Sequence, residues 1–196
     1  MPISLQQRLF NALKRVDFVT LDEATALGVN KMMLSRLVKS GELLRPARSI
    51  YATNLDWLSD PLRRYAPACT LYPGAVICGV SALLFYDLSD EYERSPWLAF
   101  PYGECIKSSD YHVTCFRAEA YAAGIESHRV GKRHVRIYDR EKSVIDAFKL
   151  LPVDVAHKAL RGYLKQPHRD LKKLTAYGRQ LRKPIDDIVA LLLSDE

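Results

Sequence analysis

The segment from Thr20 to Gly41 constrains the fold most, because it contains two helix caps and two helix-ending glycines at short intervals. Thr20 and Glu23 form the pattern of a capping box, which predicts that a short helix begins here. Gly28 can end that helix, since glycine adopts the left-handed conformation without steric cost. Asn30 can cap the next helix, which is predicted over residues 31–40. Two helices joined by so short a turn cross at a steep angle, as in a helix-turn-helix.

Helical and extended patterns flank this motif on both sides. Leucines at helical spacing over residues 5–13 predict an amphipathic helix before it. Residues 43–45 and 49–52 predict two short strands around a tight turn after it. A helix, a capped helix, a basic helix and a hairpin follow one another in the order of a winged helix-turn-helix. We therefore predict a winged helix-turn-helix domain over residues 1–53.

The predicted helix over residues 31–40 carries basic and polar side chains away from its apolar stripe. A helix of this kind fits the major groove of DNA, where such side chains meet base edges and phosphates. Arginines in the wing would reach the DNA backbone or the adjacent minor groove. The predicted DNA-binding residues are Thr20, Lys31, Met32, Ser35, Arg36, Lys39, Arg45 and Arg48.

Charge is distributed unevenly along the 196 residues. Residues 1–52 contain 8 basic and 4 acidic groups, residues 53–127 contain 5 and 10, and residues 128–183 contain 16 and 5. Two basic blocks around an acidic middle indicate a polyanionic partner, with nucleic acid favoured over a membrane. The second block suggests a further basic surface at Arg161, Lys165, Lys172, Lys173, Arg179 and Arg182. Such a surface would bind DNA or an acidic protein, or would simply be solvated.

The sequence after residue 60 predicts a second domain of mixed type, preceded by a linker over residues 54–60. Pro67 is expected to end a short helix. Helical spacing returns after Asp139, which is predicted to cap a helix, and continues towards the C-terminal end. Strands are predicted at residues 75–78, 97–101, 111–116 and 134–138. The predicted fold class is α+β, with the winged helix followed over residues 60–196 by a mixed α/β domain with a helical C-terminal end.

Two short acidic patterns resemble catalytic motifs only weakly. Asp87 and Asp90 lack the D-x-D spacing of a nucleotidyltransferase metal pair. The segment from Asp139 to Lys142 has nuclease-like residue types in the wrong order, and helix capping accounts for its acids better. We therefore predict no enzymatic activity, no cofactor and no metal site.

The remaining compositional features concern the compartment. Cys69, Cys78, Cys105 and Cys115 form no C-x-x-C pair, so we expect reduced and mostly buried thiols rather than a zinc site. The N-terminus lacks the apolar run of a signal peptide. No apolar stretch has the length of about 20 residues that is needed to cross a bilayer. A cytoplasmic protein without membrane contact is expected.

Several segments resemble AbiEi-type antitoxins of bacterial type IV toxin–antitoxin systems. Residues 73–83, with the sequence PGAVICGVSAL, resemble the PGAV-x-x-G-x-SAL segment of that family. Residues 135–146, with the sequence VRIYDREKSVID, resemble its v-r-v-x-d-x-E-(K/R)-(S/T)-x-x-D segment, and residues 98–101 resemble a strand that runs into proline. Residues 35–52 match its winged helix at several positions.

The resemblance implies an operon role. Proteins of this family bind inverted repeats of double-stranded DNA in their own promoter and repress transcription. Their C-terminal domain counteracts a nucleotidyltransferase toxin, and no stable complex with the toxin is expected. Two alternatives remain open. One is a stand-alone winged-helix transcription regulator with a ligand-sensing or dimerisation domain, and the other is a nuclease or nucleotidyltransferase that the winged helix targets to DNA.

Overall fold

The computed structural model describes residues 3–194. The chain forms two compact units. The first contains the chain up to Pro73 together with a later segment, Arg129–His134. The second contains Gly74–His128 and the chain from Val135 onward. The first unit is therefore assembled from two parts of the sequence that lie far apart.

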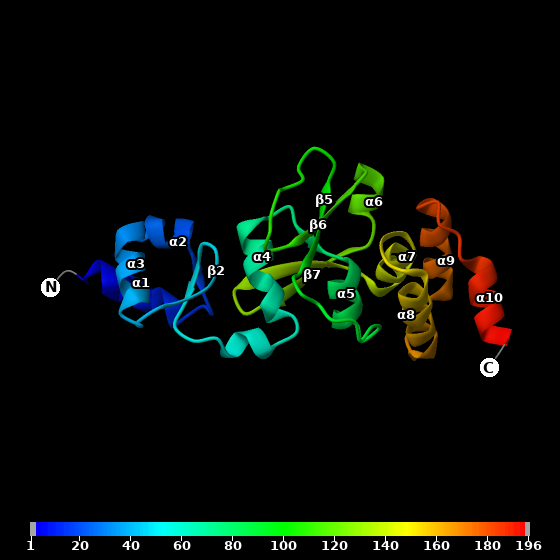
Figure 1. Ribbon diagram of the computed structural model, residues 1–196, viewed down its shortest axis with the longest axis horizontal. Coiled ribbons are helices and arrows are strands. Elements are labelled where there is room, and N and C mark those ends of the chain that lie inside the picture. The colour runs from blue at the N-terminus through cyan, green and yellow to red at the C-terminus, as the bar shows by residue number, and fades with distance from the viewer. Residues whose placement is uncertain (1–2, 195–196) are drawn as a thin grey trace. The chain divides into compact units, whose positions relative to one another are not determined.

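The first unit contains the predicted winged helix (Figure 1). Its elements are α1 (Leu5–Leu13), β1 (Val19–Thr20), α2 (Leu21–Ala26), α3 (Lys31–Lys39), β2 (Leu44–Ala47) and β3 (Ile50–Ala52). The strands form an antiparallel sheet in the order β1-β3-β2, with Val19 opposite Tyr51. This is three helices with a small sheet and a hairpin, so the fold class expected for this part is confirmed.

The caps that the sequence indicates are present. The Thr20 hydroxyl accepts a hydrogen bond from the Glu23 amide at 3.1 Å, and the Glu23 carboxylate accepts one from the Thr20 amide at 2.8 Å. The Asn30 side chain accepts from the Met33 amide at 2.9 Å, which starts α3. Gly28 has a φ of 86°, so the turn between the helices uses the left-handed conformation that favours glycine.

One cluster of buried apolar side chains holds the three helices and the sheet together. Leu9 of α1, Leu34 and Leu37 of α3 and Tyr51 of β3 all belong to it. Burying a leucine side chain stabilises a fold by about 1.5–3 kcal/mol, so this small cluster is a large part of what fixes α3 against the rest of the unit.

Two predictions about the segment after the wing are wrong. The expected linker includes a 3-10 helix, η1 (Asp56–Ser59), whose Trp57 is buried and packs 5.4 Å from the Phe18 ring. Pro67 does not end a helix; it lies in the first turn of α4 (Ala66–Leu71), after a 3-10 turn η2 (Arg63–Tyr65). Proline fits there because the first amides of a helix need no partner within it.

The second unit combines a mixed sheet with a group of helices (Figure 1). Its strands are β4 (Val76–Ile77), β5 (Trp97–Pro101), β6 (His112–Phe116), β7 (Ile125–Val130) and β8 (Arg133–Tyr138), in the order β6-β5-β4-β8-β7. The tip of the β7–β8 hairpin belongs to the first unit. β4 pairs antiparallel with β5 and parallel with β8, and β5 pairs parallel with β6.

The helices of this unit are α5 (Gly79–Phe85), α6 (Ala118–Ala122), α7 (Arg140–Leu150), α8 (Val153–Lys165), α9 (Leu171–Gln180) and α10 (Asp186–Ser194). Leu83, Val144, Leu160, Leu174 and Val189 come from five of them and share one buried cluster. The mixed fold and the helical C-terminal end are as predicted, and none of the helices in the described residues has the length and apolar character to cross a bilayer.

The prediction for the cysteines is correct for two of the four. Cys69 and Cys78 are free and buried. Cys105 and Cys115 are instead joined in a disulfide, with their Cα atoms 6.1 Å apart. Their separation of ten residues gives no motif; Cys115 lies on β6, and Cys105 lies in the segment between β5 and β6.

Candidate nucleic-acid interface

The exposed face of α3 is the centre of the candidate interface. Leu34 and Leu37 point into the core, so the residues between them face solvent because of the helical period. Met32 is 79% exposed, and the other predicted residues of this helix are also exposed: Lys31, Ser35, Arg36 and Lys39. The structure thus places five of the predicted DNA-binding residues outside the core on one short helix.

The cations of this face carry charge that no carboxylate of the described residues neutralises. Lys31, Arg36 and Lys39 form no ion pair within residues 3–194. Arg36 can donate to both acceptors on the major-groove edge of guanine, and the two lysines can neutralise phosphates. A duplex would be the natural source of that negative charge.

The wing adds two further exposed arginines. Arg45 lies on β2, and Arg48 lies in the turn before β3. The turn includes Ser49 with a φ of 61°, a left-handed conformation that tightens the reversal between the strands. Neither arginine forms an ion pair with a described residue, so both remain available to a phosphate backbone.

Thr20 differs from the other seven predicted residues. The residue is 6% exposed, and its side chain caps α2 through the Glu23 amide. A buried hydroxyl that already accepts a backbone hydrogen bond is held in place to start the helix. We therefore assign Thr20 a structural position and leave the other seven as the candidate contacts.

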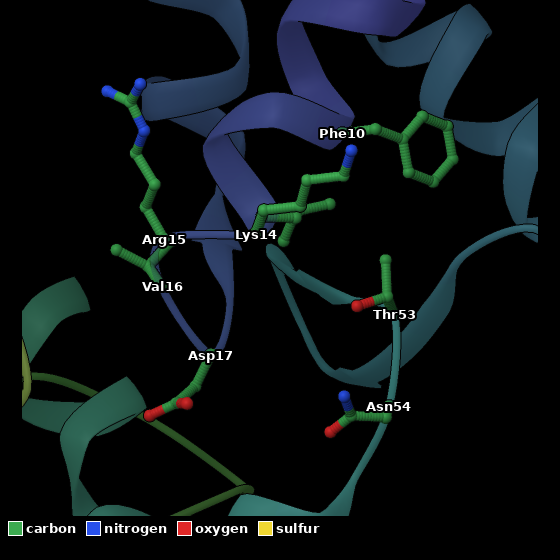
Figure 2. Close-up of a pocket in the computed structure, with 8 residues that line it drawn as sticks. Phe10, Lys14, Arg15, Val16, Asp17, Thr53 and Asn54 are labelled. Carbon is green, nitrogen blue, oxygen red and sulfur yellow. The ribbon is translucent and has the colours of Figure 1, made fainter.

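A hollow of about 550 Å³ lies elsewhere on the same unit, between the end of α1 and the residues after β3. In Figure 2, Phe10 and Lys14 border it on one side and Thr53 and Asn54 on the other, while the Arg15 side chain points away. Within the described part of the chain, none of the predicted DNA-binding residues lines it. The hollow is therefore distinct from the candidate interface.

The predicted second basic surface divides into two groups. Lys173 on α9 lies 3.0 Å from Asp139 and 3.1 Å from Glu141, and Arg179 lies 2.6 Å from Asp186. These two cations therefore already have carboxylate partners in the second unit, although the Arg179 side chain is largely exposed. The other four are exposed and form no ion pair with a residue in the range 3–194: Arg161, Lys165, Lys172 and Arg182.

A polar cluster surrounds the start of α7, where the nuclease-like residue types occur. Asp139 caps the helix by accepting from the Lys142 amide at 2.8 Å, as predicted. The Tyr177 hydroxyl donates to Asp139, and burial together with this bond raises the pKa of Tyr177 to about 12. Glu141 accepts from the buried Tyr163 hydroxyl at 2.8 Å. The acids of this segment are thus engaged in internal bonds.

Lys142 and Asp146 form an ion pair one turn apart on α7, and both side chains are buried. The Lys142 ammonium also lies 4.2 Å from the Tyr138 ring centroid and 4.6 Å from that of Phe116. Burial raises the pKa of Asp146, although Lys142 acts in the opposite direction. No group of three or more His, Cys, Asp or Glu side chains in the described residues is arranged to hold a metal ion.

Arg133 is a residue of the first unit whose role the sequence did not reveal. It is the first residue of β8, next to the turn that joins β7 to β8, and its guanidinium bonds to Glu23 and to the Phe18 carbonyl. Its place in the sequence, 110 residues after its partner, carries no local signal. Only the folded chain brings the two together.

Comparison with known proteins bears on the first unit. A search of curated proteins finds no match to this chain. The model of one protein family does match, over residues 7–54, and that family is described as "Transcriptional regulator, AbiEi antitoxin". The matched segment begins in α1 and ends just after β3, so it covers the winged helix described above. Residues 7–54 of this chain therefore match the AbiEi antitoxin family of transcriptional regulators, which indicates DNA binding by this part.

Proposed function

We propose that this protein is a DNA-binding antitoxin that represses its own operon. The exposed and unneutralised cations of α3 carry the proposal, because they lie on the helix that a winged helix-turn-helix inserts into the major groove. The family match over residues 7–54 supports it. Inverted repeats in the promoter are the proposed target, with α3 reading base edges and the wing arginines contacting phosphates.

Binding to the protein's own promoter tests the repressor role. A labelled duplex from the region directly upstream of the gene is titrated with wild type and with Arg36→Ala, beside a duplex of scrambled sequence. We expect the wild type to prefer the promoter, and Arg36→Ala to lose part of that preference. Equal affinity for both duplexes would contradict sequence-specific repression.

The antitoxin role is proposed for the second unit. It would counteract a nucleotidyltransferase toxin encoded beside this gene, without forming a stable complex with it. Co-expression of the neighbouring gene with the full chain, and with an Arg36→Ala chain that is impaired only in DNA binding, separates this role from repression. Toxicity that persists in the presence of both chains would contradict it.

A second candidate is a stand-alone regulator whose second unit senses a ligand. A cleft of about 760 Å³ favours it, lined by aromatic and charged side chains of the second unit that include Tyr86, Glu126, His128 and Arg140. A cleft of this size accommodates a small molecule. Under this candidate the neighbouring gene is not toxic, and a metabolite extract shifts both the melting temperature and the affinity for the promoter.

The four unpaired cations of α8, α9 and the segment after α9 are proposed as a weaker polyanion surface. Removing the charge of Lys172 should then weaken binding to non-specific duplex DNA at low salt, because a phosphate contact is lost. The slope of log affinity against log salt concentration should fall by about 0.9, the amount for one phosphate contact. An unchanged slope would leave these residues as solvated surface.

A further inference from the structure

We propose that Arg133 is a positioning residue of the DNA-binding unit, which holds the start of α2 and, through it, the orientation of α3. The segment Arg129–His134 is part of the first compact unit although it lies far along the chain. The proposal rests on DNA binding by α3 and adds that the winged helix matched over residues 7–54 needs a residue from outside that range.

The Arg133 guanidinium bonds to two points on the segment that leads into α2. Both of its terminal nitrogens donate to the Glu23 carboxylate, one of them at 2.8 Å, and one also donates to the Phe18 carbonyl at 2.9 Å. The guanidinium carbon lies 4.7 Å from the Phe18 ring centroid. A planar guanidinium that donates two parallel hydrogen bonds to one carboxylate fixes orientation as well as distance. We call this bidentate pair of Arg133 and Glu23 the fork.

Glu23 links Arg133 to the helix cap. The same carboxylate oxygen that accepts from Arg133 also accepts from the Thr20 amide at 2.8 Å. Burial tends to raise the pKa of Glu23, but the bonds from Arg133 and from the Thr20 amide outweigh it, and the pKa lies below its ordinary value. Glu23 is therefore ionised at neutral pH, as a charged clamp requires.

α2 depends on such contacts because it is short. Six residues form less than two turns, and a helix of that length is not stable by itself in water. The following turn at Gly28 leads directly into α3, so a shift at the start of α2 moves the recognition helix. The position of α3 relative to the wing is thus tied to the fork between Arg133 and Glu23.

Arg133 is placed to act through Glu23 rather than by touching DNA. Its side chain is 15% exposed, and both terminal nitrogens already donate to protein acceptors. The neighbouring Lys132 lies in the turn directly before β8 and is exposed, so it supplies a matched control with the same charge. Gly131, with a φ of 59°, forms the tight turn that brings Arg133 into register.

The test is a double-mutant cycle on affinity for the promoter duplex, measured well below the melting temperature of each full-length variant. Arg133→Met removes the fork. Glu23→Gln removes the charge but keeps an oxygen that can accept from the Thr20 amide, so the helix cap survives. We expect each to weaken binding by at least about fivefold, the lower end of coupling between separate sites, and the double variant to be no weaker than either.

Three further measurements make the outcome decisive. Lys132→Gln should bind within about twofold of wild type, and the salt slope of Arg133→Met should be unchanged, whereas a lost phosphate contact would lower it by about 0.9. Hydrogen exchange in Arg133→Met should rise over residues 18–27 and stay unchanged over α7.

Wild-type affinity in Arg133→Met, or additive losses in the cycle, would overturn the inference. Tighter binding by Glu23→Gln together with a reduced salt slope in Arg133→Met would also overturn it, because Arg133 would then contact DNA itself. Arg36→Ala separates the two levels of the argument. If Arg36→Ala weakens binding and Arg133→Met does not, the positioning role fails alone; if neither weakens it, DNA binding by α3 fails as well.

Discussion

Lys31, Arg36 and Lys39 of the first basic block extend into solvent, whereas Lys142, Lys173 and Arg133 of the second block each contact a carboxylate. The second block contains twice as many basic residues as the first, 16 against 8. Net charge along the sequence is therefore a poor guide to where a polyanion binds. The α3 cations of the first block form no ion pair with a described residue, whereas the second block uses several of its own to hold the fold together.

The largest effect is expected where a cation is completely buried. Lys142→Met removes the cation that offsets the burial of Asp146 and leaves this side chain unpaired in the core, so the free energy of unfolding should fall by about 3–5 kcal/mol. The chain has two tryptophans, and Trp97 lies in the second unit, so its fluorescence in a Trp57→Phe background reports this transition alone. A double variant, Lys142→Met with Asp146→Leu, should recover most of the loss. An unaffected single variant would show that the pair does not support the core.

Arg36→Ala is the matching test in the first block. Removing an exposed cation that reads a base should weaken promoter binding by about 1–3 kcal/mol and leave the melting temperature unchanged. Fluorescence anisotropy with the promoter duplex measures the first quantity, and a thermal melt measures the second. A stability loss without a binding loss would remove the contrast between the blocks.

Lys173→Met tests a cation of intermediate exposure. Asp139 and Glu141 are buried and would lose charge-assisted hydrogen bonds, so the second unit should lose about 1–2 kcal/mol of stability, discounted because Lys173 itself is partly exposed. DNA affinity should not change. A loss of DNA affinity without a loss of stability would indicate that Lys173 contacts a polyanion.

Acid should weaken the fork between Arg133 and Glu23. The pKa of Glu23 is lowered in the folded chain, so its contribution to stability is fully present above its ordinary value of 4.5 and is lost as the pH falls further, through the folded value. Wild type should therefore melt a few degrees above Glu23→Gln at pH 7, since a shift of about 2–4 °C corresponds to 1 kcal/mol in a chain of this size. The difference should narrow as the pH falls below 4.5 and close once Glu23 is protonated in the folded chain. A difference in melting temperature that persists at such acid pH would show that it does not arise from the charge of Glu23.

Lys172→Gln completes the series with the smallest expected effect. The residue is exposed and forms no ion pair with any residue in the described part of the chain, so stability should change by less than about 0.5 kcal/mol. Lys173→Met lies one position further along α9 and removes a cation that contacts two carboxylates. Comparing the two variants therefore separates the effect of losing a charge from the effect of losing a contact.

Local signals account for what the sequence predicts well. The caps at Thr20, Asn30 and Asp139 each involve atoms three residues apart, so the pattern is visible without the fold. The same holds for the exposed face of α3, which follows from the helical period.

The elements that the sequence does not reveal depend on distant partners. β1 has two residues and exists because it pairs with β3, and β7 has mostly polar, partly exposed side chains without a clear alternation. The disulfide between Cys105 and Cys115 and the fork between Arg133 and Glu23 arise only in three dimensions. Trp57 is buried, but it lies in a segment whose polar composition resembles that of a linker.

The discontinuous first unit has a consequence for synthesis. The ribosome completes the winged helix matched over residues 7–54 long before residue 134 emerges, and at about 5–20 residues per second the delay amounts to seconds. If Arg133 sets the geometry of α3, a nascent or prematurely terminated chain holds a winged helix that is not yet aligned for its operator. Repression would then begin only once about half of the second unit has also been translated, which couples the onset of gene silencing to synthesis well beyond the winged helix itself.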